Sequence, residues 1–223
     1  MNINTELEKY INECIMRQYD SNDVGGHGRE HILSVIERSF ELAENFKLPV
    51  NLDMVYVVAA YHDIGYKENA KEHERVSSEK FLEDNEMKKF FNEDERKIIA
   101  EAIVDHRASL EYEARSIYGK LVSSADRAIS VDTILERSVS YQTDKLKNEN
   151  PKDMDIIENS YKKLSTKYGK EGYAKMYYPD EKYQKFLNEI QDLIANKDKF
   201  IDMELKIIKN KHKVKNEDDN KES

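Results

Sequence analysis

An apolar run that ends in two metal-binding side chains is the feature that most constrains the fold of this chain. Residues 55–61 read VYVVAAY, and His62 and Asp63 follow directly. A helix that is apolar nearly all round must be buried among other helices. Gly65 lies two residues beyond Asp63, where a left-handed C-cap would end the helix. Neighbouring side chains inside a helix point about 100° apart, so His62 and Asp63 could reach one ion only at a helix end.

The composition favours an all-α fold. Of the 223 residues, 36% are charged, and only seven are Gly and three are Pro. A β-sandwich or a repeat array needs more turn residues than this, whereas helices with charged outer faces account for the composition. In addition to the helix that ends near Asp63, apolar periodicity predicts helices over residues 3–19, 29–46, 72–84, 92–107, 115–143, 152–168 and 180–209.

The chain is long enough for one well-packed domain with some length to spare. The polar segment 144–151 (DKLKNENP) is the best candidate for a boundary. We therefore expect a core over residues 1–143 and a helical extension over 144–208 that packs on this core. Residues 209–223 are rich in charge and lack apolar periodicity, which predicts a disordered tail.

Charge and cysteine content exclude several classes of protein. A formal charge of −9 argues against a general nucleic-acid surface, which needs clustered Lys and Arg. The single cysteine, Cys14, excludes an internal disulfide and a Cys-rich zinc site. No run approaches the roughly 20 apolar residues of a membrane span, and MNINTELEKY has no signal-peptide profile. We expect a cytoplasmic protein that does not bind a membrane; its helical faces permit a homodimer.

Four residues in helical contexts are candidate metal ligands: His31, His62, Asp63 and Asp126. His31 lies on the inward stripe of its helix, and Asp126 shares a face with Val122. Each has an alternative role: a core histidine bonded to a carbonyl, a helix cap, or a salt bridge to a distant arginine, since Arg127 points to another side of the helix. A buried carboxylate is costly unless it is paired or binds a cation. One shared ion explains the whole set better than separate roles do.

The order His31, His62–Asp63, Asp126 resembles that of the HD-domain superfamily of metal-dependent phosphohydrolases. The likeness runs from about Gly25 to Ile134 and is carried by HGREHILSVI, AAYHDIGY, EHERVSSEKFL, EAIVDHRAS and IYGKLVSSADR. It implies an HD-domain helical bundle with a helical C-terminal extension, and the four residues as ligands of a divalent ion. Two His and two Asp admit Mn, Mg, Fe, Ni, Co or Zn. The segments EHERVSSE and VDHRAS are similar to those of small bacterial HD hydrolases, some of which act on nucleotides.

Three further histidines lie close to these motifs. His106 and His73 both fall on predicted inward faces of their helices. In the HD superfamily, extra histidines at such positions ligate a second metal or contact the substrate phosphate. We favour substrate contact or proton transfer for both, with a second metal as the alternative. His27 lies one turn before His31, and we expect it to orient ligands or order its loop rather than bind metal.

Basic residues near the motifs are candidates for phosphate binding. A solvated helix face is the default for each of them, yet Arg107 and Arg115 flank the predicted site within an acidic protein. Arginine forks match phosphate oxygens in pairs, so these two form the preferred pair, and Lys67 is the third candidate. Glu68 is an acid–base candidate, although a solvated loop carboxylate is the stronger interpretation.

These residues together predict a metal-dependent phosphohydrolase. It would cleave a phosphoester or phosphoanhydride bond of a small phosphorylated metabolite, with a nucleotide favoured. Asp63 would ligate the metal and orient a water molecule, and His106 or His73 would protonate the leaving oxygen. The alternative is a catalytically silent regulatory or interaction module that binds metal or nucleotide.

Overall fold

Every regular element that the structure describes is a helix. The computed structural model describes residues 3–20 and 27–219, with the side chains of 213–219 left out, and no strand occurs in these ranges. The all-α fold predicted from the composition is thus confirmed. By its internal contacts the chain divides into unit 1, Met1–Arg127 with Lys175–Asp180, and unit 2, Ala128–Ala174 with Glu181–Ser223. None of the helices in the described part combines the length and apolar character that a membrane crossing requires.

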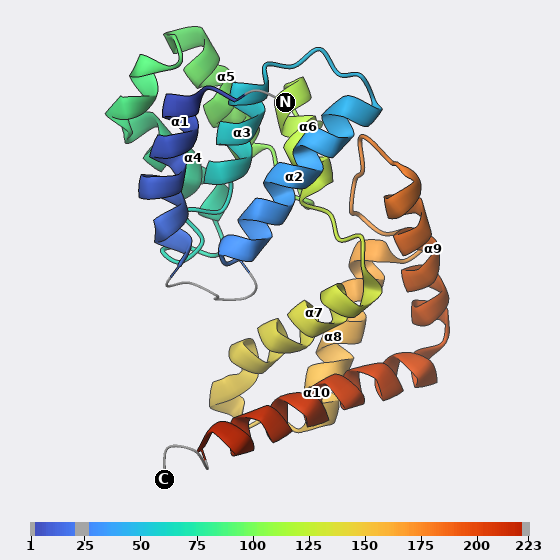
Figure 1. Ribbon diagram of the computed structural model, residues 1–223. Helices are drawn as coiled ribbons and strands as arrows, with labels where there is room; N and C mark the ends of the chain where they lie inside the picture. Colours follow the sequence, from blue (N-terminus) through green and yellow to red (C-terminus); the bar gives the residue numbers. More distant parts are fainter. Residues whose placement is uncertain (1–2, 21–26, 220–223) are drawn as a thin grey trace. The chain divides into compact units, whose positions relative to one another are not determined.

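In the residues that the structure describes, unit 1 is a bundle of the helices α1 to α6 (Figure 1). The first helix continues through a π-helical turn and a 3₁₀ turn, and a 3₁₀ turn separates α4 from α5. The elements are α1 (Thr5–Tyr10), the turns Ile11–Ile15 and Met16–Tyr19, α2 (Arg29–Asn45), α3 (Leu52–Tyr61), α4 (His73–Glu83), the turn Asn85–Lys89, α5 (Glu93–Val104) and α6 (Ile117–Ala125).

The central helix of unit 1 is α3. Its residues Val55, Val57 and Val58 are 0% exposed, and it packs against α2, α5 and α6. The side chain of Asn51 caps it by accepting a hydrogen bond from the N–H of Asp53, 2.9 Å away. An apolar helix with a capped start thus places the His–Asp pair at the centre of the bundle.

Gly65 serves a purpose different from the predicted C-cap. Its backbone is not in the left-handed region, and a Cβ there would lie 2.7 Å from Cβ of Val76 and 2.8 Å from N of Ser77. The N–H of Gly65 donates to Oγ of Ser77 at 2.9 Å. The glycine is required by the close approach of α4, which brings the start of that helix next to the end of α3.

The helix predicted over residues 115–143 is two helices. α6 ends at Ala125, and α7 (Val131–Leu146) begins after Ser130, whose side chain accepts a hydrogen bond from the N–H of Thr133. The break puts Asp126 at a helix end, as Asp63 is. It also marks the division by internal contacts between the units, at 127/128, after which α7 packs on α8. The domain boundary at 143/144 stays a prediction.

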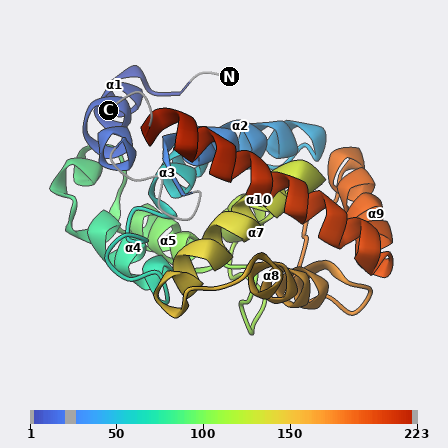
Figure 2. The same cartoon turned by 90° about the horizontal axis from the view of Figure 1, so that it is seen from below.

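Unit 2 consists of α7, α8 (Asp153–Tyr168), α9 (Glu181–Ala195) and α10 (Lys197–Asp219), and α10 packs against the other three (Figure 2). The predicted helix over 180–209 is divided at Asn196 into α9 and α10. α10 runs to Asp219, so much of the stretch 209–223, for which the sequence predicts a disordered tail, follows a helical path. Lysine and glutamate, which are common in this stretch, are good helix formers.

Candidate metal centre

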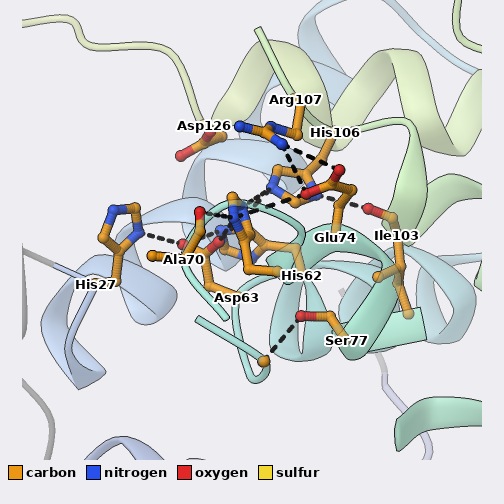
Figure 3. Close-up of polar contacts among 12 residues, drawn as sticks. His27, His62, Asp63, Ala70, Glu74, Ser77, Ile103, His106, Arg107 and Asp126 are labelled. Carbon is orange, nitrogen blue, oxygen red and sulfur yellow. Dashed lines mark hydrogen bonds and ion pairs between the residues drawn. The ribbon is translucent and has the colours of Figure 1, made fainter. Parts of the chain in front are cut away.

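Five helices of unit 1 bring their ends together around Asp63. The carboxylate follows α3, and the residues around it come from the starts of α2 and α4 and from the ends of α5 and α6. Figure 3 shows this convergence, with Asp63 between the imidazoles. The contributing side chains are His27, His31, His62, His73, His106 and Asp126. Sequence positions from 27 to 126 thus form one cluster.

One oxygen of Asp63 faces a first group of histidines. Its Oδ2 lies 2.6 Å from Nδ1 of His27, 3.1 Å from Nε2 of His62 and 3.4 Å from Nε2 of His31. Nε2 of His31 is also 3.2 Å from Oδ1 of Asp126. The structure therefore brings together all four residues that the sequence predicts as ligands, with His27 as a fifth. The HGREH spacing puts His27 and His31 one turn apart and is the signal for this proximity.

The other oxygen of Asp63 faces a second group. Its Oδ1 lies 3.2 Å from Nε2 of His73 and 3.6 Å from Nε2 of His106. The two imidazole nitrogens are 3.2 Å from each other. Ligand atoms of Asp63, His73 and His106 all lie within 4.8 Å of one another, as do those of His31, His62 and Asp126. Asp63 therefore stands between two groups, each of which could hold an ion.

The buried atoms at the centre fit a divalent cation. Nε2 of His31, Nε2 of His62 and Oδ1 of Asp63 are buried and make no hydrogen bond within the described residues. Three of the imidazoles have Nδ1 close to a carbonyl oxygen. Since a carbonyl only accepts hydrogen bonds, Nδ1 must carry a proton, so each ring in its neutral form has the Nε2 lone pair toward the centre. The pairs are His62 with Ala59 (2.7 Å), His73 with Ala70 (3.1 Å) and His106 with Ile103 (2.6 Å).

The electrostatics of the cluster keep its carboxylates charged. Burial alone raises the pKa of Asp63, but the nearby His62 and His27 more than offset this and hold it well below its usual value. Burial likewise opposes ionisation of Asp126, but the close contact of its Oδ1 with Nε2 of His31, at 3.2 Å, holds that pKa well below the usual value. Two anionic carboxylates among imidazoles form a mixed N and O donor set that suits a borderline divalent ion.

The histidines of the cluster differ in protonation. Burial lowers the pKa of His62, but the charges of Asp63 and Asp126 outweigh it and raise the pKa to about 9. For His106 burial is the largest effect and the pKa falls below its ordinary value. His106 is therefore neutral at pH 7, with its one proton on Nδ1. A neutral imidazole in this tautomer can bind a cation through Nε2 but has no proton to donate from that atom.

The predicted phosphate-binding arginines both have carboxylate partners. Nη1 of Arg107 donates to both carboxylate oxygens of Glu74, at 3.0 Å each, beside the second histidine group (Figure 3). Arg115 donates two hydrogen bonds to Oδ1 of the fully buried Asp105, from Nη2 at 2.7 Å and from Nε at 3.1 Å. The guanidinium of Arg115 thus fixes the loop that follows His106, a pairing that the sequence analysis did not identify.

Lys67 borders a small cavity that reaches Asp63. The cavity, about 20 Å³, has room for about one water molecule. It is lined by Gln18, Tyr19, His27, Asp63, Ile64, Tyr66 and Lys67. Glu68, the predicted acid–base candidate, forms an ion pair with Lys80 instead. Its side chain is 58% exposed, which supports the interpretation as a solvated loop carboxylate.

Arg127 is a site residue whose position the sequence analysis predicted wrongly. The helix ends at Ala125, so Arg127 is not carried to another side of α6 but turns inward, with its side chain 1% exposed. Its Nη1 lies 3.4 Å from Oδ2 of Asp126. Helical periodicity could not place it because it lies outside the helix.

Comparisons with known proteins agree with this geometry. Residues 28–129 match the family model described as the HD domain, a region that includes every residue of the cluster except His27. No curated protein and no solved structure matched the chain. HD domains bind divalent metals, and the His and Asp side chains gathered here fit that role. Residues 28–129 of the chain therefore form an HD domain.

Proposed function

We propose that the protein is a metal-dependent phosphohydrolase that cleaves a phosphoester or phosphoanhydride bond of a small phosphorylated metabolite. One observation carries the proposal: the two oxygens of the buried, anionic Asp63 face two groups of imidazoles whose Nε2 atoms converge. A nucleotide is the favoured substrate, because two segments of the chain are similar to those of small bacterial HD hydrolases, some of which act on nucleotides.

The first group supplies the principal ion site. His31, His62, Asp63 and Asp126 would hold a divalent cation, with His27 orienting Asp63 through its contact with Oδ2. Such an ion supplies a Lewis acid to a phosphoryl oxygen and lowers the pKa of a water molecule beside it. The surrounding helices exclude bulk water, which strengthens every charge interaction of the carboxylates.

The second group favours a second ion over proton transfer. His106 is neutral with its proton on Nδ1, so its Nε2 is a ligand rather than an acid. His73 has the same orientation, with Nδ1 directed at the carbonyl of Ala70. In this assignment Asp63 bridges the two sites, and substrate contact by His73 or His106 is the alternative role.

Phosphate recognition falls to cations at the edge of the cluster. Arg107 lies next to His106 and shares Glu74 with the second group, since Nδ1 of His73 is 3.7 Å from Oε2 of Glu74. An incoming phosphate would compete with Glu74 for the fork of Arg107. Lys67 provides a second positive charge at the cavity that reaches Asp63.

Turnover by chelator-stripped protein tests the proposal. Mn²⁺, Mg²⁺, Co²⁺ or Ni²⁺ would be added back, and release of phosphate or pyrophosphate measured from a panel of nucleotides and generic phosphoesters. We expect metal-dependent turnover that disappears in Asp63→Asn. A wild-type chain that binds metal but stays silent across the panel would contradict the hydrolase and favour a silent metal-binding regulatory module.

A further inference from the structure

A short segment of the chain leaves unit 2 to join unit 1. Lys175–Asp180 belongs to unit 1, although the residues on both sides of it, Ala174 and Glu181, belong to unit 2. The segment also lies beyond residues 28–129, which match the HD family model. We call Lys175–Asp180 together with Arg127 the brace.

The brace first holds the end of α6. Oγ of Ser124, which is 1% exposed, accepts hydrogen bonds from the N–H groups of Tyr177 and Tyr178 at 3.1 and 3.3 Å. Ser124 stands two residues before Asp126. A buried hydroxyl that binds two successive amides of a distant segment fixes both that segment and the helix end.

The brace next holds the loop that follows His106. Nζ of Lys175 donates to the carbonyls of Leu110 and Tyr112, at 3.3 Å each. The N–H of Ala114 donates to Oη of Tyr177 at 3.0 Å. Three backbone groups of this loop are thereby tied to two side chains of the brace.

The brace also reaches α2, the helix that carries His31. Asp180 accepts a hydrogen bond from Nη2 of Arg38 at 2.5 Å. Arg38 is 5% exposed and lies about two helical turns after His31. An ion pair with one partner so deeply buried is costly to break, so Asp180 restrains the axial position of α2.

Arg127 connects these contacts to the ligands themselves. Its Nε donates to the carbonyl of Lys175 at 3.2 Å, and its Nη2 donates to the carbonyl of His106 at 3.2 Å and to Oγ of Ser123 at 2.7 Å. Its Nη1 faces Oδ2 of Asp126 at 3.4 Å. With Oδ2 occupied in this way, Oδ1 of Asp126 is the oxygen that points to His31.

We infer that the brace is a positioning element for the metal centre: it fixes α2, which carries His31, the loop that follows His106, and the end of α6, which Asp126 follows. The inference rests on the proposed function in that it requires the cluster to bind metal. Residues behind the ligands commonly change metal affinity by about 10- to 100-fold, because they set ligand orientation without touching the ion.

Metal affinity of the full chain tests the inference. Ser124→Ala removes the acceptor for two brace amides, and Arg127→Gln removes the link to Asp126. Ser39→Ala and Arg96→Gln are the matched controls, since the buried hydroxyl of Ser39 donates to the carbonyl of Val35 within α2, and Arg96 donates to the carbonyl of Leu82. The readouts are the Mn²⁺ dissociation constant by chelator competition, the visible spectrum of the Co²⁺ form and the thermal unfolding of the metal-free chain.

We expect the Mn²⁺ dissociation constant to rise about 10-fold in Ser124→Ala and more in Arg127→Gln, with an altered Co²⁺ spectrum. The controls should lose stability without losing affinity. If Ser124→Ala and the folded Arg127→Gln bind both ions as the controls do, the inference is overturned while the hydrolase stands. A wild type that binds Mn²⁺ but cleaves no phosphoester contradicts only the hydrolase, and one that binds no metal overturns both.

Discussion

Each unit of the molecule buries a carboxyl group, and the pKa values of the two groups are shifted in opposite directions. Asp63 in unit 1 is 3% exposed and faces five imidazoles, which hold its pKa well below the usual value. Glu204 in unit 2 is 0% exposed and forms no ion pair with the residues that the structure describes, so burial raises its pKa to about 8 in spite of a hydrogen bond from Ser160 at 2.5 Å. Burial by itself therefore neutralises a carboxyl group.

The surroundings of Glu204 are polar but neutral. The hydroxyl of Ser160 lies 2.7 Å from that of Ser138. Oε2 of Glu204 and Oε1 of Gln142 are both buried, and neither has a hydrogen-bond partner in the described part of the chain. A protonated Glu204 supplies a donor that an ionised one lacks. In unit 1 the buried Asp63 is therefore an anion that can bind a cation. In unit 2 the buried Glu204 is an uncharged acid inside a helical core.

The sharpest way to break this contrast is to convert each acid into its amide. Asp63→Asn should lose bound metal and lose phosphoester turnover by ~10³-fold or more, because the bridging charge disappears. Glu204→Gln should leave metal content and turnover at the wild-type level. Metal analysis and activity assays of the two variants in parallel decide the matter. Retention of metal by Asp63→Asn would show that the cluster does not depend on its central carboxylate.

Removal of the second histidine group should have the next largest effect. In His73→Ala and in His106→Ala we expect metal content to fall from two ions to one per chain, and turnover to fall about 100-fold. His212→Ala is the control, because that histidine is exposed on α10 in unit 2. An unchanged metal content together with a shifted pH–rate profile would instead support proton transfer by these residues.

The acid in unit 2 should make stability depend on pH. Because the folded pKa of Glu204, about 8, lies above the ordinary value of 4.5, its stabilising effect is complete below about pH 4.5 and is lost as the pH rises to about 8. Over that window the free energy of unfolding should fall by about 1.4 kcal/mol per pH unit from this group.

Urea unfolding of metal-free wild type and Glu204→Gln at several pH values measures this dependence. The difference between the unfolding free energies of the two proteins at each pH cancels the contributions that both share, including those of unit 1. The variant should be the more stable protein at pH 8, and the advantage should shrink toward acid pH. A difference that does not vary with pH would mean that Glu204 is ionised in the native protein.

Lys67 should show the smallest effect. Lys67→Met removes a positive charge from the rim of the cavity that reaches Asp63, and we expect KM for a phosphorylated substrate to rise a few-fold with kcat and metal content little changed. Lys88→Met, at an exposed position near Asn85, is the control. If KM is the same in both variants, Lys67 does not take part in phosphate binding.

The sequence carries much of the fold and of the centre because both depend on local patterns. The apolar run before His62 predicts a central helix, and the structure buries α3 accordingly. The inward stripe of α2 similarly indicates that His31 faces the core. Periodicity fails where helices end: α6 stops at Ala125, so the expected direction of Arg127 was wrong.

Pairings between distant residues could not be predicted from the sequence. Arg115 was predicted to bind phosphate with Arg107, yet it grips Asp105, and nothing in local composition distinguishes an arginine with a buried partner from a solvated one. The brace is a stronger case, since Ser124 meets Tyr177 across the whole of α7 and α8. Such contacts depend on tertiary structure, which the local patterns of a single sequence do not reveal.

The path of the brace also imposes an order on biosynthesis. Every candidate ligand, from His31 to Asp126, leaves the ribosome before Lys175 does, because α7 and α8 are made in between. The nascent centre is therefore complete in its ligands while the segment that fixes them is still missing. We expect metal that enters during translation to exchange freely, and retention to begin only once Asp180 has reached Arg38.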